Sequence, residues 1–393
     1  MSATSDTAVP DAAMRRDPLT WYSYLALAFF SYLNSIQGNI IPFLKADLNL
    51  TYSVVSLHPS ALAVGSLLVG LAGDRLIRRF GRRRMLTVAV GGGSVGLLLL
   101  SLAGNIWMSV GSCLFMGCFA AFVPAMTSTI LAELHGARRD VAYAEANALC
   151  YVFAITAPLV LGLTVWAGLN WRMGLVPGIA TGFAVAAVFL RTPVPEQRVA
   201  VATSTAPLTP AFWAFWVMLA FSVAVEFSAL LWAPSYLGQV IGLSPSAAAL
   251  GAGAFFAGML AGRAASIRLV RTFSLRNLFF GAITTGLVGF VAYWAQGGAI
   301  IAVAGLFVIG LGVAMLFPLT LGFAMTEAGA AGARASARLI IAPGIAVLLT
   351  PPLLGAIADH AGLWLSQFTI PAFLVLAVAA FLAGEMLTRR AAA

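Results

Sequence analysis

The stretch Gly70-Leu-Ala-Gly-Asp74-Arg75-Leu-Ile-Arg78-Arg79-Phe-Gly81-Arg82-Arg83-Arg84 separates two apolar segments, each long enough to cross a lipid bilayer. It holds one aspartate and six arginines. Charged side chains are costly in the hydrocarbon core, so this stretch is expected to be a short loop at a membrane face. Short loops rich in lysine and arginine stay in the cytoplasm during insertion. The stretch therefore predicts a membrane-spanning chain with this loop in the cytoplasm.

The composition supports this interpretation. Of 393 residues, 61% are hydrophobic and 9% charged, which excludes both an ordinary soluble domain and a disordered chain. The net charge of +9 comes from small arginine clusters separated by apolar runs, so it is expected to set membrane topology rather than to bind nucleic acid. The cysteines and histidines show no metal or disulfide pattern, and we expect buried thiols, surface histidines, no cofactor and no enzyme activity. These residues are Cys113, Cys118, Cys150, His58, His135 and His360.

The spacing of the basic clusters predicts the number of crossings. All but Lys45 and Arg172 of the 22 lysines and arginines fall in clusters, and each interval between clusters is long enough for two spans. Six intervals predict an all-α membrane protein with twelve transmembrane helices and both termini in the cytoplasm. We expect a monomer in a bacterial-type inner membrane. The expected helices run approximately over residues 19–44, 54–75, 85–103, 106–134, 142–167, 173–190, 210–236, 244–263, 277–294, 298–325, 337–358 and 363–387.

The chain is expected to divide into two halves. Residues 191–209 are polar and rich in proline, which predicts a cytoplasmic linker. A cytoplasmic tail (1–18) and a six-helix bundle (19–190) precede it, and a second six-helix bundle (210–388) follows.

A weak internal repeat relates the two bundles. A shift of 192 residues carries Pro42 to Pro234. A shift of 194 residues carries Gly111 to Gly305, Pro124 to Pro318, Glu133 to Glu327, Pro158 to Pro352 and Gly168 to Gly362. Such matches predict a parallel duplication about an axis normal to the membrane, and hence two pseudo-symmetric bundles. The alternative is a chance alignment of glycine and proline in apolar sequence.

With these features the chain resembles the major facilitator superfamily over nearly its whole length. The family's loop between helices 2 and 3 reads roughly Gly-x-x-x-Asp-Arg-x-Gly-Arg-Arg. The matching residues are Gly70, Asp74, Arg75, Gly81, Arg82 and Arg83. Five residues, Leu76–Phe80, stand where the family usually has one, and about one extra turn of helix 2 would accommodate them. The resemblance implies a transporter with a two-bundle fold.

The resemblance also implies a gate at the cytoplasmic face. Asp74 is expected to face a helix N-terminus near Ser336, where the backbone dipole favours an anion. Glu133 with Arg138 or Arg139, and Glu327 with Arg334, are expected to add ion pairs that hold this face closed. The alternative is that these are solvated charges that serve only topology. The expected gate comprises Gly70, Asp74, Arg75, Gly81, Arg82, Glu133, Arg138, Arg139, Glu327 and Arg334.

Glu226 is the one acidic residue well inside an expected span. A carboxyl group at that depth is costly, so it is expected to face a cavity, where burial favours its protonated form and suits it to carry a proton. The repeat pairs it with Asn34 in helix 1, one turn from Gln37 and close to Asn39. The alternatives are a neutral Glu226 bonded between helices, and amides that only join helices.

The expected central site also includes three aromatic residues, Trp232, Tyr236 and Phe317, which otherwise pack or face lipid. With no lysine or arginine expected inside a span, a neutral or cationic small molecule is the expected substrate. The predicted function is proton-coupled uptake of such a solute by alternating access. Efflux of lipophilic cations or drugs is the alternative, and a sensor or scaffold on the same fold is a third hypothesis.

Overall fold

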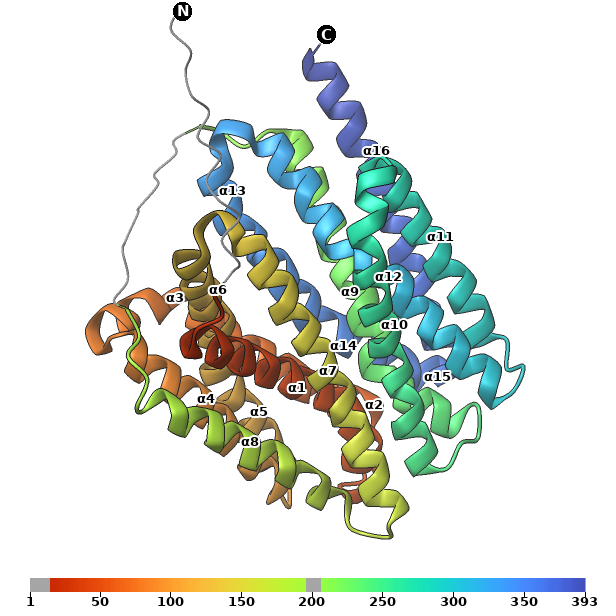
Figure 1. Cartoon of the computed structure of the whole chain (residues 1–393). Coiled ribbons are helices and arrows are strands. Elements are labelled where there is room, and N and C mark those ends of the chain that lie inside the picture. Colours follow the sequence, from red (N-terminus) through yellow and green to blue (C-terminus); the bar gives the residue numbers. More distant parts are fainter. Residues whose placement is uncertain (1–14, 196–205, 393) are drawn as a thin grey trace, which may run out of the picture.

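The computed structural model describes residues 15–195 and 206–392, and within these ranges every regular element is a helix (Figure 1). Residues 1–14 of the expected tail, residues 196–205 of the expected linker, and the side chains of residues 71, 72, 74, 333 and 392 lie outside this description. The first helices are α1 (Pro18–Asp47), α2 (Tyr52–Val55), α3 (Leu57–Phe80), α4 (Arg82–Ser101), α5 (Ile106–Ala120), α6 (Phe122–His135), α7 (Arg139–Trp166) and α8 (Val176–Phe189). The second set is α9 (Pro210–Gln239), α10 (Pro245–Thr272), α11 (Leu275–Trp294), α12 (Ala299–Ala328), α13 (Gly332–Leu339), α14 (Ile341–Ala361), α15 (Leu363–Ser366) and α16 (Thr369–Ala392).

The helices pack mainly with others from the same part of the chain. In the first part α1 packs on α7, α3 on α5, and α4 on α5 and α8. In the second part α12 packs on α10 and α11, and α9 on α12, α14 and α16. The two parts meet where α1 contacts α9, α7 contacts α10, and α14 contacts α2 and α3 (Figure 1).

Ten described segments are long and apolar enough to cross a membrane, and the chain is an integral membrane protein. One of the ten, Ile106–Trp166, has 61 residues and contains α5, α6 and α7. The chain turns within this segment at a 3₁₀ turn, Gly136–Arg138, so α7 runs back along α6. Helix α1 has 30 residues and is not among the ten.

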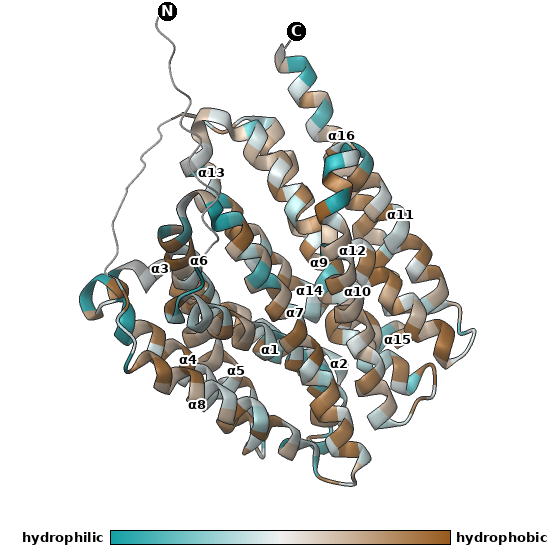
Figure 2. Ribbon diagram, viewed as in Figure 1, coloured by the Kyte–Doolittle hydropathy of each residue, from teal (hydrophilic) through white to brown (hydrophobic). Residues whose placement is uncertain are grey.

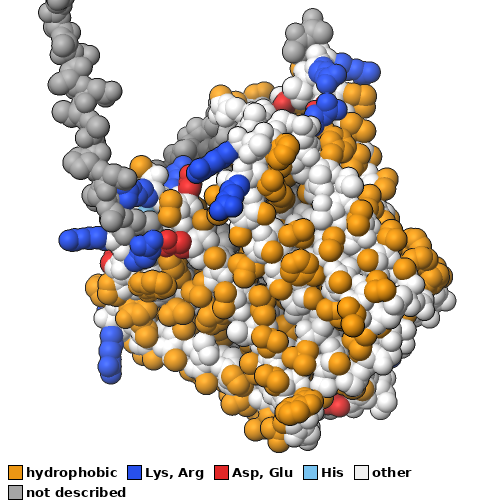
Figure 3. Space-filling view, turned by 45° about the vertical axis from the view of Figure 1, so that its right-hand side comes forward, with side chains coloured by type: hydrophobic (Ala, Val, Ile, Leu, Met, Phe, Trp, Pro, Cys, Tyr) orange, Lys and Arg blue, Asp and Glu red, His pale blue; other side chains and the backbone are white. Residues whose placement is uncertain are grey.

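Polar residues gather at the ends of the helices, and their middles are apolar (Figure 2). In the space-filling view most visible lysine and arginine side chains lie toward the upper end, above a broad hydrophobic surface (Figure 3). We call this end, where α3 ends and α16 ends, the basic end, and the other the opposite end. The hydrophobic surface between them is the part that contacts lipid.

The extra turn expected in the second helix is confirmed. Helix α3 continues through Phe80 and stops at Gly81, which has φ 78° and ψ 153°. An L-residue with a side chain rarely adopts that φ, so glycine ends α3 here and allows α4 to begin at Arg82. The five residues that depart from the family pattern therefore lengthen the helix instead of forming a loop.

The last turns of α6 and α12 have the same local geometry. Helix α6 ends at Gly136 with φ 50° and ψ −113°, and α12 ends at Gly329 with φ 46° and ψ −118°. A 3₁₀ turn follows each glycine. The predicted repeat pairs these two helices through Glu133 and Glu327, which lie in their last turns.

Candidate substrate site and gates

Helices α1 and α9 cross closely at Gly38. A Cβ atom on Gly38 would lie 2.4 Å from the carbonyl oxygen of Leu230 and 2.8 Å from the Cα atom of Leu231. The backbones meet because no side chain stands between them. This crossing joins the two parts of the chain about two-thirds of the way along both helices.

Asn34 and Glu226 each lie four residues before this crossing, on helices that both run from the basic end. They are therefore at the same depth, about one turn on the basic side of the crossing. The amide of Asn34 donates to the carbonyl of Phe30 in its own helix at 2.9 Å. Glu226 is half-buried, and among the described residues no hydrogen bond joins it to Asn34.

Three polar side chains, Tyr151, Glu226 and Arg263, come from three helices at this level. Arg263 of α10 donates from Nε to the hydroxyl of Tyr151 on α7 at 3.1 Å, and its guanidinium lies 6.0 Å from the centre of that ring. Glu226 lies within electrostatic range of both Arg263 and Tyr151. We call Tyr151, Glu226 and Arg263 the charged cluster. It spans the boundary between the two parts of the chain.

The expectation that no basic residue lies inside a span is wrong for Arg263. The eighth helix was expected to end at this arginine, but α10 continues to Thr272, more than two turns further. The apolar residues Ile267, Leu269 and Val270 extend the helix, and the arginine stem packs beside Tyr151. With Arg263 inside α10, the lack of a basic residue in a span no longer disfavours an anionic substrate.

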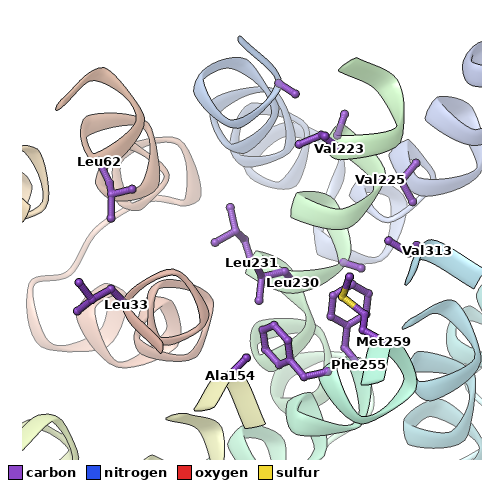
Figure 4. Close-up of a cluster of buried hydrophobic side chains, with 14 of the residues drawn as sticks. Leu33, Leu62, Ala154, Val223, Val225, Leu230, Leu231, Phe255, Met259 and Val313 are labelled. Atoms are coloured by element: carbon purple, nitrogen blue, oxygen red, sulfur yellow. The ribbon is translucent and has the colours of Figure 1, made fainter. Parts of the chain in front are cut away.

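An apolar layer lies next to the charged cluster, on the side of the opposite end. Leu230 follows Glu226 by one turn, Ala154 follows Tyr151 by about one turn, and Phe255 precedes Arg263 by about two turns on the same face of α10. Figure 4 shows these buried side chains gathered where α7, α9 and α10 meet. The charged cluster therefore lies between this apolar layer and the basic end.

Gln37 and Asn39 are buried within the first part of the chain. The Gln37 carbonyl accepts from the thiol of Cys113 on α5 at 3.6 Å, and Asn39 donates to the carbonyl of Ser35 at 2.9 Å. Among the described residues, the Gln37 Nε2 and Asn39 Oδ1 atoms have no hydrogen-bond partner. Both amides thus hold spare hydrogen-bonding capacity at the depth of the crossing.

The three aromatic residues expected at the central site lie in different surroundings. Trp232 is fully buried, with its ring 5.6 Å from that of Tyr52 on α2. Tyr236 faces α11, where it donates to the carbonyl of Trp294 at 3.2 Å. Phe317 is half-buried on α12 and packs against the core. The structure places none of these three in the charged cluster.

The strongest ion pair of the expected gate is between Arg82 and Glu133. Two nitrogens of the buried Arg82 donate to the two Glu133 oxygens at 2.6 and 3.0 Å, and one also reaches the carbonyl of Pro195 at 3.3 Å. This pair holds α4 to α6 at the basic end. The sequence placed both residues in the gate but did not pair them, because they lie 51 positions apart.

Replacing Glu133 by glutamine is expected to lower the free energy of unfolding by about 2 kcal/mol, because a buried guanidinium loses its anionic partner. Thermal unfolding in detergent measures the change. The matched control is Arg84→Ala, which removes an exposed arginine two positions away from Arg82 and is expected to leave the melting temperature nearly unchanged. Equal effects of the two substitutions would show that the pair does not stabilise the bundle.

The other expected gate residues are distributed as follows. Glu327 accepts from the hydroxyls of Thr209 and Thr388 at 2.8 and 2.9 Å, and Arg334 donates to the carbonyl of Ala206 at 3.4 Å. In place of the expected partner Arg334, hydroxyls from α16 and the start of α9 reach the Glu327 carboxylate.

Around the loop itself, Gly70 faces open space and Arg75 is exposed. Arg138 belongs to the 3₁₀ turn after α6, and Arg139 lies 3.8 Å from the carboxylate of Asp140. The side chain of Asp74 lies outside the described residues.

A second latch, at the opposite end, was not predicted. The carboxylate of Asp359 in α14 accepts from the backbone nitrogens of Tyr52 and Ser53, each at 2.8 Å, and from the Ser53 hydroxyl at 2.6 Å. It therefore caps the N-terminus of α2, where the helix dipole favours an anion. We call Asp359 with Tyr52 and Ser53 the opposite-end latch. No sequence pattern indicates it, because its partners are backbone groups about 300 residues away.

Further contacts close the same end. The Tyr52 hydroxyl donates to the Gln239 carbonyl of α9, and the ammonium of Lys45 lies 4.5 Å from the Tyr52 ring centre. A Cβ atom on Gly355 would lie 2.7 Å from the carbonyl oxygen of Tyr52, so α14 and α2 touch through their backbones. Both parts of the chain are thus in direct contact here.

Of the three histidines expected at the surface, only His58 is fully buried. His58 is 1% exposed, with Nδ1 2.8 Å from the Val55 carbonyl and Nε2 2.9 Å from the Ser109 hydroxyl. His135 is half-buried, with Nε2 2.9 Å from the Thr20 hydroxyl. Both rings join neighbouring helices through hydrogen bonds. His360 is exposed.

A cavity of about 310 Å³ lies between α1, α9 and the start of α10, toward the opposite end. Its walls include Pro42 and Pro234, the two prolines related by the repeat, together with Ser235 and Gln239. Glu226 does not line it. The cavity lies beside the crossing of the two parts and is separate from the charged cluster.

Comparison with solved structures shows which fold this is. The chain is similar to a bacterial homologue of the human lysosomal transporter Spinster in an inward-facing, unoccupied conformation, with a TM-score of 0.74, 18% identity and 95% and 98% of the two chains covered. A point mutant of the nucleoside transporter NupG gives a TM-score of 0.75 at 14% identity over 94% and 99%. A D-xylose–proton symporter gives 0.65 at 16% over 94% and 96%.

A comparison with curated protein sequences finds no match. The family model of the Major Facilitator Superfamily matches residues 23–337, which is most of the chain and includes the loop after α3, the charged cluster and the ends of α6 and α12. This chain therefore belongs to the major facilitator superfamily.

Proposed function

We propose that this chain is a secondary active transporter that takes up a small organic solute by alternating access, coupled to protons through Glu226. Members of the family are transporters and not enzymes. The observation that carries the proposal is the position of Glu226. It lies inside α9, at the boundary between the two parts of the chain and within electrostatic range of Arg263.

The topology belongs to the same proposal. The ten apolar segments become twelve spans in two steps. Helix α1 adds one span, and Ile106–Trp166 counts as two, because α7 runs back along α6. The bundles then comprise residues 19–190 and 210–388, with the linker 191–209 between them. The matching ends of α6 and α12 support a pseudo-symmetric relation. Because basic residues stay in the cytoplasm, we assign the basic end and both termini to the cytoplasmic side of an inner membrane.

The contacts at the opposite end support alternating access. Asp359, Tyr52 and Gln239 close that end through hydrogen bonds between the two bundles. At the basic end Arg82 with Glu133, and Glu327 with Thr209 and Thr388, make contacts that stay within one bundle. The molecule therefore fits a state that is closed at the outside, and rocking of the bundles would exchange the closed end.

Glu226 is suited to couple this movement to a proton. Removing a carboxylate from water costs free energy, and binding a proton removes that cost. A bundle rearrangement that moves Glu226 away from Arg263 then favours the protonated acid, while approach of Arg263 favours the carboxylate. The proton would therefore bind and leave in step with the movement.

Proteoliposomes containing the purified chain and a pH-sensitive dye test this function. Sugars, nucleosides, amino acids, organic cations and organic acids are added outside in turn. We expect one class to drive proton entry and to accumulate when the outside is acidic. Solute flux that does not respond to the proton gradient would overturn proton coupling. Accumulation driven in the reverse direction, with dye resistance in cells, would indicate efflux.

A further inference from the structure

The guanidinium of Arg263 has two terminal nitrogens that the protein does not use. Its Nε atom is bound by Tyr151, and among the described residues neither Nη1 nor Nη2 has a hydrogen-bond acceptor. Glu226 lies within electrostatic range of this guanidinium, and among the described residues no ion pair joins the two. The Tyr151 contact orients the guanidinium and leaves its planar fork free.

A free guanidinium fork in a membrane-embedded helix is a specific binding element. Its two parallel N–H groups match the two oxygens of a carboxylate, and the bidentate pair is stronger where water is partly excluded. Arg263 is half-buried, and an apolar layer of Ala154, Leu230 and Phe255 lies on one side of it. These surroundings suit a small anion with an apolar body.

We propose that the substrate is a small organic monocarboxylate, bound through its carboxylate to Arg263 and carried together with a proton on Glu226. This inference rests on the proposed function and names its substrate class. It replaces the neutral or cationic solute that the sequence alone suggested.

The net charge of the site is zero both without and with bound substrate. With no substrate, the positive Arg263 and the ionised Glu226 compensate each other. When a carboxylate binds Arg263, the cluster would hold two anions and one cation, so Glu226 takes up a proton. The loaded site is then again neutral. Because a buried net charge is costly, anion and proton would cross together. One positive charge offers no compensation for a dianion, which disfavours dicarboxylates.

Binding to the purified full-length chain tests the substrate class. The probes are matched series: acetate, lactate and benzoate, their neutral amides, and benzylamine as a cation. We expect at least one carboxylate to raise the melting temperature and its amide to have no effect. Arg263→Gln is expected to weaken carboxylate binding by about tenfold to a hundredfold, because a charge-assisted pair is lost. Arg263→Lys is expected to restore only part of it, since lysine lacks the fork.

The control is Arg268→Gln, which removes an exposed arginine from the same helix and is expected to leave the affinity unchanged. Size-exclusion elution identifies variants that fail to fold, and Tyr151→Phe then serves as the milder variant, with binding weakened severalfold. If amides or benzylamine bind as well as carboxylates, or if no carboxylate in the series binds, the substrate assignment is wrong.

A second measurement separates this inference from the proposed function. Proton-coupled uptake of a neutral solute, unaffected by Arg263→Gln, would overturn the substrate class and leave the transporter proposal standing. Carboxylate exchange that is lost in Arg263→Gln but never responds to pH would support the anion site. It would exclude Glu226 as the proton carrier and so overturn proton coupling.

Discussion

Replacement of Glu226 by glutamine is expected to abolish accumulation of solute against a gradient while leaving solute exchange across the membrane. Glutamine imitates the protonated acid and cannot release a proton, so the bundles still rock but the movement is no longer coupled. We expect the initial rate of proton-driven uptake to fall at least a hundredfold, which corresponds to a rise of about 3 kcal/mol in the activation free energy. Counterflow of labelled solute in proteoliposomes measures the exchange that remains.

The matched control for this variant is Glu385→Gln. Glu385 also lies on a long helix, near its end, where it is 3.4 Å from Arg276. Its loss is expected to change uptake less than twofold, because an ion pair near the surface contributes little. Accumulation that persists in Glu226→Gln would place the proton carrier elsewhere. Loss of both accumulation and exchange would show that Glu226 is needed for the movement itself.

Replacement of Asp359 by asparagine is expected to shift the equilibrium toward the state that is open at the opposite end. The carboxylate accepts three hydrogen bonds from Tyr52 and Ser53, and the neutral amide binds these donors more weakly. Loss of charge-assisted bonds worth about 1.5 kcal/mol corresponds to roughly a tenfold change in the ratio of the two states. Spin labels placed on α2 and α14 report the change as a longer distance between them.

Ser53→Ala provides a graded comparison, since it removes one of the three bonds and is expected to give a smaller shift in the same direction.

Gly355→Ala tests the closure of the opposite end by steric conflict instead of by loss of hydrogen bonds. The added methyl group would lie 2.7 Å from the Tyr52 carbonyl oxygen, so α14 and α2 must separate. We expect the same direction of shift as in Asp359→Asn, measured with the same labels. Unchanged distances in both variants would mean that these contacts do not hold the opposite end closed.

The opposite-end latch and the inner gate inferred from the sequence involve different helix contacts. Asp359 near the far end of α14 binds the start of α2. Asp74 lies near the basic end of α3 and was expected to face a helix N-terminus near Ser336, which belongs to α13. The contact expected for Asp74 stays a prediction for the basic end.

Several features were predictable because they follow from local sequence. The membrane class follows from apolar segments and basic clusters, and the family follows from the Asp74-Arg75 and Gly81-Arg82 pattern. The extension of α3 to Phe80 follows from the number of residues before a glycine. Glu226 was singled out because a carboxyl group inside an apolar run is rare and costly. None of these requires knowledge of which helices are neighbours.

The surroundings of Arg263 could not be predicted from the local sequence. Its place at the end of an apolar run suggested a topological role, but α10 continues past it and Tyr151 of another helix binds its Nε atom. Periodicity gives the ends of helices only approximately, and it gives no information on the partner across a helix boundary.

The sequence by itself determined that the chain spans a membrane, which family it belongs to, and which acid lies within a helix, because hydropathy and charge act locally along the chain. Only the tertiary structure decided that Arg82 binds Glu133, that Asp359 caps α2, and that Arg263 binds Tyr151. Contacts between distant segments depend on how helices pack, and that packing is set by many weak interactions at once, which no single stretch of sequence encodes.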